Sequence, residues 1–357
     1  MKSVKRWKAA LSALGLALAF FAAAPFMSCS NASEGPSIIV PPPSDGGASS
    51  GGTTTDGQGG TQSPDGGSSG GQTQNPTGAP TDGGQSQGGQ TQDTTDPALN
   101  VPLTLEAIEA GAVVTFSNKA QGAVTYKVNG GEAQTIASGE SKAITLAAAG
   151  DKVQFFGDNK SYASHPYPSD DWSFESWTRS SIGCSADCYV YGNILSLIKS
   201  ENFAKVNFDE DASSPFYGFF ANNTHIKNKD GEDLLLPATT IAGGCYEFMF
   251  YGCSGLTKAP ALPATKITSY CYNSMFEGCS NLTSAPSELP ATKLEEGCYN
   301  NMFKACVSLT TPPALPATTL AKICYSCMFY RCAKLTSAPE LPATTLAESC
   351  YNSMFDG

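Results

Sequence analysis

The chain has 357 residues, a formal net charge of −11 and only 15% charged residues. This balance excludes nucleic acid as a partner class, because phosphate binding needs a basic stripe and the one basic cluster lies at the extreme N-terminus. The 36 glycines and 23 prolines are spread unevenly, so the folded part is shorter than the length indicates.

The N-terminus predicts export. Four basic residues within positions 2–8 precede an apolar run at 9–24, which is short for a membrane span. The sequence FMSC then resembles a lipoprotein signal, in which Cys29 becomes the lipidated first residue of the mature protein. Cleavage after Ala24 is the alternative, although it places Pro25 directly after the cut. Residues 1–28 are therefore predicted as a lipoprotein signal peptide, and the protein as anchored by lipid to a bacterial outer membrane, at the cell surface.

Residues 29–98 are predicted to be a disordered tether. This segment is dominated by Gly, Ser, Thr, Gln, Asp and Pro and contains no Lys or Arg. Such a composition buries too little apolar surface to offset the entropy lost on ordering the chain. The tether would hold the folded part away from the membrane.

Residues 99–200 are predicted to be a small β-rich domain. Asn129-Gly130-Gly131 is a hairpin signal between two short runs of strand-forming residues. Several short strands with turns between them favour a small sandwich. The runs expected as strands are 103–108, 113–117, 123–128, 142–147 and 152–156.

Residues 236–357 repeat one sequence four times and begin it a fifth time. The first copy reads LPATTIAGGCYEFMFYGCSGLTKAPA, and its first cysteine recurs at intervals of 26, 27, 26 and 26 residues. A period of this length is typical of units that bury their apolar faces only by stacking on neighbours. The fifth copy stops before its second cysteine, which suggests that further repeats follow.

Each repeat is predicted to contain a short helix and an extended run. On a helix, the apolar residues of CYxxMFxxC fall within one arc of about 140°. The LTxAPxLP run that follows is expected to point Leu256, Ala259 and Ala261 inward and to leave Pro260 outward. Prolines recur at two registers, so the ladder between repeats should be continuous only between them.

At these residues a family resemblance appears. Leu-Pro, a short extended segment, Met-Phe-x-Gly-Cys and then Leu-Thr-Ser resemble the BspA-type (Treponema pallidum-type) leucine-rich repeats of bacterial surface proteins. The resemblance implies attachment to host proteins or to other bacteria. The predicted fold class is therefore α+β: a leucine-rich-repeat solenoid with a short helix plus an extended strand per coil, preceded by a small all-β sandwich-like domain and a disordered linker.

Residues 201–235 are predicted to be a degenerate capping repeat. Phe219 to Ile226 aligns with Met249 to Leu256, with Asn223 at the position of Cys253. Terminal repeats of such arrays are expected to be atypical. The β-rich domain and the repeats should then share an interface.

The thirteen cysteines invite a disulfide or metal interpretation in an exported protein. Cys245 and Cys253 are eight residues apart, too far along a helix for a disulfide, so the repeat cysteines are expected to be buried free thiols. Cys184 and Cys188, outside the repeats, are the candidate disulfide. No metal site, cofactor or catalytic constellation is recognisable, and the chain is not expected to be an enzyme.

The predicted function is a surface-anchored, adhesin-like binding protein whose partners are host extracellular-matrix or bacterial surface proteins. The alternative is a structural or antigenically variable surface coat without a specific ligand, and an envelope-associated hydrolase is a third possibility. The candidate binding residues are polar and expected to be exposed, and near-uniform Thr and Ser suggest a weak, multivalent contact. They are Thr257, Lys258, Thr283, Ser284, Thr310, Thr311, Thr336 and Ser337.

Overall fold

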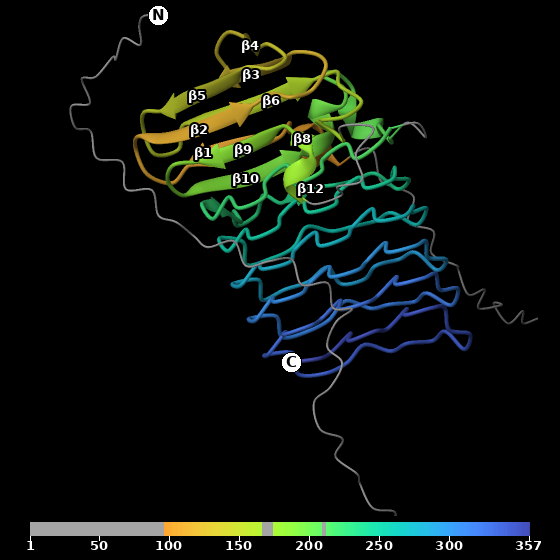
Figure 1. The fold of residues 1–357 in the computed structure, drawn as a ribbon. Coiled ribbons are helices and arrows are strands. Elements are labelled where there is room, and N and C mark those ends of the chain that lie inside the picture. The colour runs from red at the N-terminus through yellow and green to blue at the C-terminus, as the bar shows by residue number, and fades with distance from the viewer. Residues whose placement is uncertain (1–95, 166–173, 209–211) are drawn as a thin grey trace, which may run out of the picture. The chain divides into compact units, whose positions relative to one another are not determined.

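The computed structural model describes residues 96–165, 174–208 and 212–357, all within one compact unit. The predicted signal peptide, Cys29 and nearly all of the predicted tether lie outside the described residues. The part up to residue 208, called the β-region here, contains strands and 3-10 turns, and the part from residue 212, the repeat region, follows it in successive layers (Figure 1). No helix in the described ranges is long and apolar enough to cross a membrane.

Ten strands build the β-region into two larger sheets and one small one. The larger sheet runs in the order β11-β10-β1-β6-β3-β4, with β12 also paired to β10, and the second runs β5-β2-β9. Strands β7 and β8 pair only with each other. The strands are β1 (Thr104–Ala107), β2 (Ala112–Ser117), β3 (Val124–Val128), β4 (Gln134–Ile136), β5 (Ser141–Leu146), β6 (Lys152–Gly157), β7 (Ala163–Ser164), β8 (Thr178–Arg179), β9 (Ser181–Cys184) and β10 (Cys188–Asn193).

The five expected strand runs coincide, within a residue or two at their ends, with β1, β2, β3, β5 and β6. Alternation explains why: along β2, Ala112, Val114 and Phe116 are fully buried while the residues between them face outward. The predicted hairpin is also confirmed, because β3 pairs with β4 around Asn129 and Gly130, which both have positive φ.

Two further strands join the β-region to residues 212–235, which are called the first repeat here and precede the four clean repeats. Strands β11 (Ile226–Lys227) and β12 (Leu234–Leu235) both run parallel to β10. The described part of the β-region also contains four short 3-10 helices, η1 (Pro97–Asn100), η2 (Phe174–Ser176), η3 (Ile194–Leu197) and η4 (Phe203–Lys205). Ile194, Leu195 and Leu197 of η3 join the main core, whereas Phe174 of η2 belongs to a separate aromatic cluster.

The CYxxMFxxC segments are not helices but chains of consecutive β-turns. In the first clean repeat the N–H groups of Met249 and Tyr251 donate to the carbonyls three residues before them, at 3.2 and 3.0 Å. The N–H groups between them, of Phe248 and Phe250, donate instead to Asn273 and Met275 of the next repeat, both at 2.9 Å. The backbone N–H groups therefore alternate along the segment: one closes a turn within its own repeat, and the next bonds to the following repeat.

Every fourth residue of these segments has positive φ. The stretch before the clean repeats shows the same pattern at 214, 218 and 222. It also bonds to the next repeat in the same way, since Phe216 N–H donates to the carbonyl of Cys245 at 2.9 Å. The positions are 214, 218 and 222; 244, 248 and 252; 270, 274 and 278; 297, 301 and 305; 323, 327 and 331; and 349, 353 and 357.

The predicted α+β solenoid, with a helix and a strand in each coil, is wrong. The described residues contain no α-helix, and the named strands all belong to the β-region sheets and the two strands paired with β10. An α-helix needs each N–H to bond four residues back within one segment, whereas here half of the donors bond to another repeat. The residues with left-handed φ at intervals of four would also break a helix.

Inward and outward positions follow a period of four rather than 3.6. Cys245, Tyr246, Met249, Phe250 and Cys253 are all buried, as the helical pattern also predicted. If Cys245 is counted as position 0, these residues occupy positions 0, 1, 4, 5 and 8. Both periods place these positions on one side, because a helix rotates by only about 40° beyond a full turn every four residues. The apolar pattern alone therefore does not separate a helix from this chain of turns.

The extended runs make isolated parallel bridges instead of strands. Bridges join Lys258 to Ser284 and Glu288 to Ala314, on either side of the proline register at Pro286 and its equivalents. Proline lacks the N–H that would continue a ladder. The expected inward set is wrong at two positions: Leu256 and Ala259 are buried as expected, but Ala261 is exposed and Pro260 is buried.

The aromatic residues of successive repeats stack in two rows. Rings of Phe250, Phe276 and Phe303 lie nearly parallel with centroids 5.4 and 5.5 Å apart, and the tyrosines follow a second row, with Tyr272 and Tyr299 5.6 Å apart. The ring spacing is somewhat wider than the about 4.8 Å between neighbouring strands in a sheet, and each repeat bonds to the next through its backbone.

The thiol of the second cysteine in each repeat has a structural role. The Sγ of Cys253, Cys279 and Cys306 donates to the carbonyl of a phenylalanine in the repeat before, at 3.0 to 3.1 Å. The expectation of buried free thiols is confirmed for nine repeat cysteines. At the position of these cysteines in the first repeat, Asn223 donates from Nδ2 to the carbonyl of Ile182 in β9 at 3.0 Å.

One substitution distinguishes the chain of turns from a helix, because the change in the free energy of unfolding has opposite signs in the two conformations. Ala305 has a φ of 59°, where its sister residues Gly252 and Gly278 occupy the same place. Ala305→Gly is expected to raise the free energy of unfolding by about 1 kcal/mol, since glycine relieves left-handed strain, whereas the same change in a helix lowers it by about that amount. Urea unfolding measures the difference. Ala314→Gly, at an exposed position with negative φ, is the control and should be destabilising by about 0.5 to 1 kcal/mol.

Candidate binding face

The eight predicted binding residues lie together on one surface. All are exposed, and they form two rows that cross four consecutive repeats. We call this surface the polar face. One row is Thr257, Thr283, Thr310 and Thr336, and the other is Lys258, Ser284, Thr311 and Ser337.

Backbone hydrogen bonds hold the rows in register. The carbonyl of Thr257 accepts from the N–H groups of Thr283 and Ser284 at 2.9 and 3.2 Å. Parallel bridges then link Lys258 to Ser284 and Ser284 to Thr311. The side chains of successive repeats are therefore presented at fixed spacing on a rigid backbone.

The threonine hydroxyls form a second ladder. Thr283 Oγ1 donates to the carbonyl of Thr257 at 3.0 Å, Thr310 to that of Thr283 at 3.4 Å, and Thr336 to that of Thr310 at 3.0 Å. The hydroxyl protons of this row are thus used within the protein, and each oxygen keeps its lone pairs. The threonine row offers acceptors and methyl groups to a partner.

Asn228 terminates the polar face at its N-terminal end, and sequence reasoning missed it. Its Oδ1 accepts from the N–H groups of Thr257 and Lys258 at 2.9 and 3.0 Å, and its Nδ2 donates to the carbonyl of Lys258 at 2.9 Å. The side-chain oxygen of Asn228 therefore replaces the backbone carbonyl that accepts the equivalent hydrogen bonds between later repeats. Asn207 does the same for Thr239 and Thr240. Neither asparagine recurs with the repeat, so periodicity could not reveal them.

Charge on the polar face is limited. Lys258 Nζ pairs with Asp233 Oδ1 at 2.9 Å, and both side chains are 55% exposed. Solvent screening makes such a pair worth little. The polar face is therefore close to neutral over most of its length.

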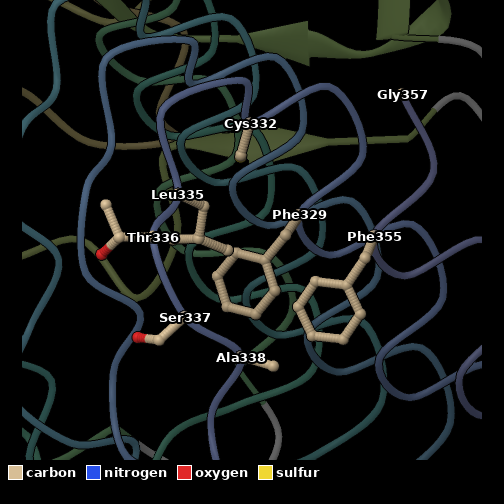
Figure 2. A pocket seen from close by; sticks show the side chains of 8 residues that line it. All are labelled: Phe329, Cys332, Leu335, Thr336, Ser337, Ala338, Phe355 and Gly357. Atoms are coloured by element: carbon tan, nitrogen blue, oxygen red, sulfur yellow. The ribbon is translucent and has the colours of Figure 1, made fainter.

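A shallow hollow adjoins the C-terminal end of the polar face (Figure 2). Its volume is about 290 Å³, and the stacked rings of Phe329 and Phe355 line it together with Thr336 and Ser337. In preceding repeats the equivalents of Phe355 are buried by the repeat that follows, whereas Phe355 is 45% exposed. The hollow lies beside the last of the described residues and contains no cluster of polar groups that would orient a small ligand. Its full lining is Phe329, Cys332, Leu335, Thr336, Ser337, Ala338, Phe355 and Gly357.

The candidate disulfide residues are brought together. Cys184 and Cys188 are both free thiols, and each affects the pKa of the other. Oxidation to a disulfide stays a prediction. Across the described ranges, no group of three or more His, Cys, Asp and Glu residues is arranged to hold a metal ion.

Comparison with known proteins finds no match to this chain among protein-family models, curated proteins or solved structures.

Proposed function

We propose that the chain is an exported, lipid-anchored surface protein that binds other proteins through the polar face. Its partners would be host extracellular-matrix proteins or surface proteins of other bacteria. The signal-like N-terminus, with Cys29 as the lipid site, supports the location.

The observation that carries this proposal is the regular spacing of exposed polar side chains over four repeats. Backbone bonds between repeats fix the positions of Thr257, Thr283 and Ser284, so little conformational entropy is lost when a partner binds. Each repeat contributes a small contact, and several together give avidity. A partner with regularly spaced hydrogen-bond donors fits the acceptors of the threonine row.

A surface coat without a specific ligand is the second candidate. The hydroxyl ladder favours it, because Thr283, Thr310 and Thr336 already use their protons to join repeats. In a coat, those threonines would serve the cohesion of the stack and the solubility of its surface. The two functions differ in whether binding is saturable.

Arginine substitutions in the second row test the binding function. Ser284→Arg with Thr311→Arg places bulky charge on the polar face without touching the hydroxyl ladder. Saturable binding of the purified chain to immobilised fibronectin or fibrinogen is expected to weaken at least about tenfold. Surface plasmon resonance measures the change.

Thr292→Arg with Thr318→Arg is the matched control, because both residues are exposed on a different row. This pair should bind as the unmodified chain does. Equal weakening by both pairs would show that the polar face is not the contact surface. An unmodified chain without saturable binding to matrix proteins or to bacterial cells would support the coat.

A further inference from the structure

Cys184 and Cys188 lie where the two main sheets of the β-region meet the repeats. Cys184 ends β9, which belongs to the β5-β2-β9 sheet, and Cys188 begins β10, which belongs to the larger sheet. Three residues separate them in sequence. A covalent link between these side chains would therefore join one sheet to the other.

Both strands bond directly to the first repeat at this point. The N–H of Ile182 donates to the carbonyl of Phe219 at 3.0 Å, and the N–H of Cys188 donates to that of His225 at 2.9 Å. Asp187, in the connecting turn, contacts His225 Nδ1 at 2.8 Å and Lys227 Nζ at 3.4 Å. The turn between the cysteines is thus part of the contact between the β-region and the repeats.

The surroundings of the two sulfurs are unequal. Cys184 is partly exposed and accepts a hydrogen bond from Asn223 Nδ2 at 3.5 Å, whereas Cys188 is fully buried. The neighbouring Cys188 thiol lowers the pKa of Cys184 against the opposing effect of burial, with a smaller contribution from Asn223. The neighbouring Cys184 sulfur, together with burial, raises the pKa of Cys188. Donors around one sulfur favour its thiolate form, which is the nucleophile.

The repeat cysteines differ from Cys184 in both burial and thiol pKa. Burial raises the pKa of Cys279 to about 12 and that of Cys324 to about 11. Their sulfurs are enclosed in the core and, in the second-cysteine row, donate to backbone carbonyls. They therefore lack both the exposure and the thiolate character that reaction requires.

We propose that Cys184 and Cys188 are a redox-active dithiol, which a disulfide oxidant converts to a disulfide that staples the two sheets together at the contact with the first repeat. This proposal is independent of the binding function of the polar face. The Cys184 thiolate attacks the oxidant disulfide, forms a mixed disulfide and releases one thiol. Cys188 then loses its proton and attacks Cys184 Sγ, which forms the intramolecular bond and releases the second thiol. The two cysteines are oxidised by two electrons and the oxidant is reduced to two thiols.

Peptide mapping by mass spectrometry tests the proposal on the full chain. The reduced protein is incubated with oxidised glutathione and then digested. The peptide containing Cys184 and Cys188 is expected to lose two hydrogen atoms, at a rate at least about tenfold above modification of Cys279 or Cys324. Hydrogen exchange at β10 and β11 should slow in the oxidised form.

Single serine variants distinguish the roles of the two thiols. In Cys188→Ser no second thiol remains, so a glutathione adduct is expected to accumulate on Cys184. In Cys184→Ser the buried Cys188 should stay unmodified. Oxidation of the repeat cysteines as fast as the pair, or absence of the adduct in Cys188→Ser, would overturn the proposal. The rate comparison in the unmodified chain needs no variant and holds if a variant fails to fold.

Discussion

Replacing Phe276 with alanine is expected to lower the free energy of unfolding by about 3 to 5 kcal/mol. The Phe276 ring is fully buried and lies between Phe250 and Phe303, with nearly parallel rings and centroids 5.4 and 5.5 Å away. Its removal leaves a cavity in the middle of the stack, where the neighbouring repeats are fixed by backbone bonds and cannot close the gap. Urea unfolding followed by circular dichroism measures the loss.

Phe355→Ala is the matched control for this prediction. Phe355 occupies the same place in its repeat, but it is 45% exposed and stacks on Phe329 alone. The expected loss is about 1 kcal/mol, the size of one aromatic pair. Equal losses in the two variants would contradict the stacked core described above.

The second large effect concerns Glu247 and the dependence of stability on pH. Burial raises the pKa of this carboxyl from its ordinary 4.5 to about 7, although Asn273 Nδ2, 2.8 Å from Oε1, favours the charged form. The folded state therefore holds a proton that the unfolded state has released between these pH values. The contribution of Glu247 to stability is therefore greatest below pH 4.5, falls as the pH rises toward 7, and then levels off.

Glu247→Gln is expected to be stabilising by about 2 kcal/mol at pH 8, since each unit of pKa shift corresponds to about 1.4 kcal/mol and the site is not wholly closed to water. Glutamine keeps an oxygen that accepts from Asn273 and carries no charge. At pH 4 the variant and the unmodified chain should be nearly equal. Thermal unfolding across this pH range measures the difference.

Glu340→Gln provides the comparison, because Glu340 is exposed and its charge stays hydrated in the folded chain. Its unfolding curve should follow that of the unmodified chain at each pH. A Glu247→Gln variant that is less stable than the unmodified chain at pH 8 would contradict the inferred burial of charge.

The sequence predicted which residues form the polar face but not the hydrogen bonds that they make. The repeat showed that Thr257 and Thr283 occupy equivalent places, and the structure puts them on one exposed surface. The hydroxyl ladder and the Asn228 cap depend on which carbonyl lies beside each side chain. Those neighbours are about one repeat away in sequence, so no local pattern contains them.

Local sequence determined more of the β-region than of the repeats. Alternation along β2 and the glycines after β3 are local signals, and the strands formed where these signals lay. The order of strands in the two sheets carries no such signal. It places Cys184 and Cys188 on different sheets and brings Asn223 to the first of them.

The sequence by itself determined the repeat, its length, and which residues of CYxxMFxxC face inward. Only the tertiary structure decided the local conformation, and it replaced the expected helix with a chain of β-turns. The reason is that half of the backbone donors, such as those of Phe248 and Phe250, find their acceptors in the following repeat. A single repeat cannot satisfy its own backbone in this way, so the conformation exists only when repeats stack.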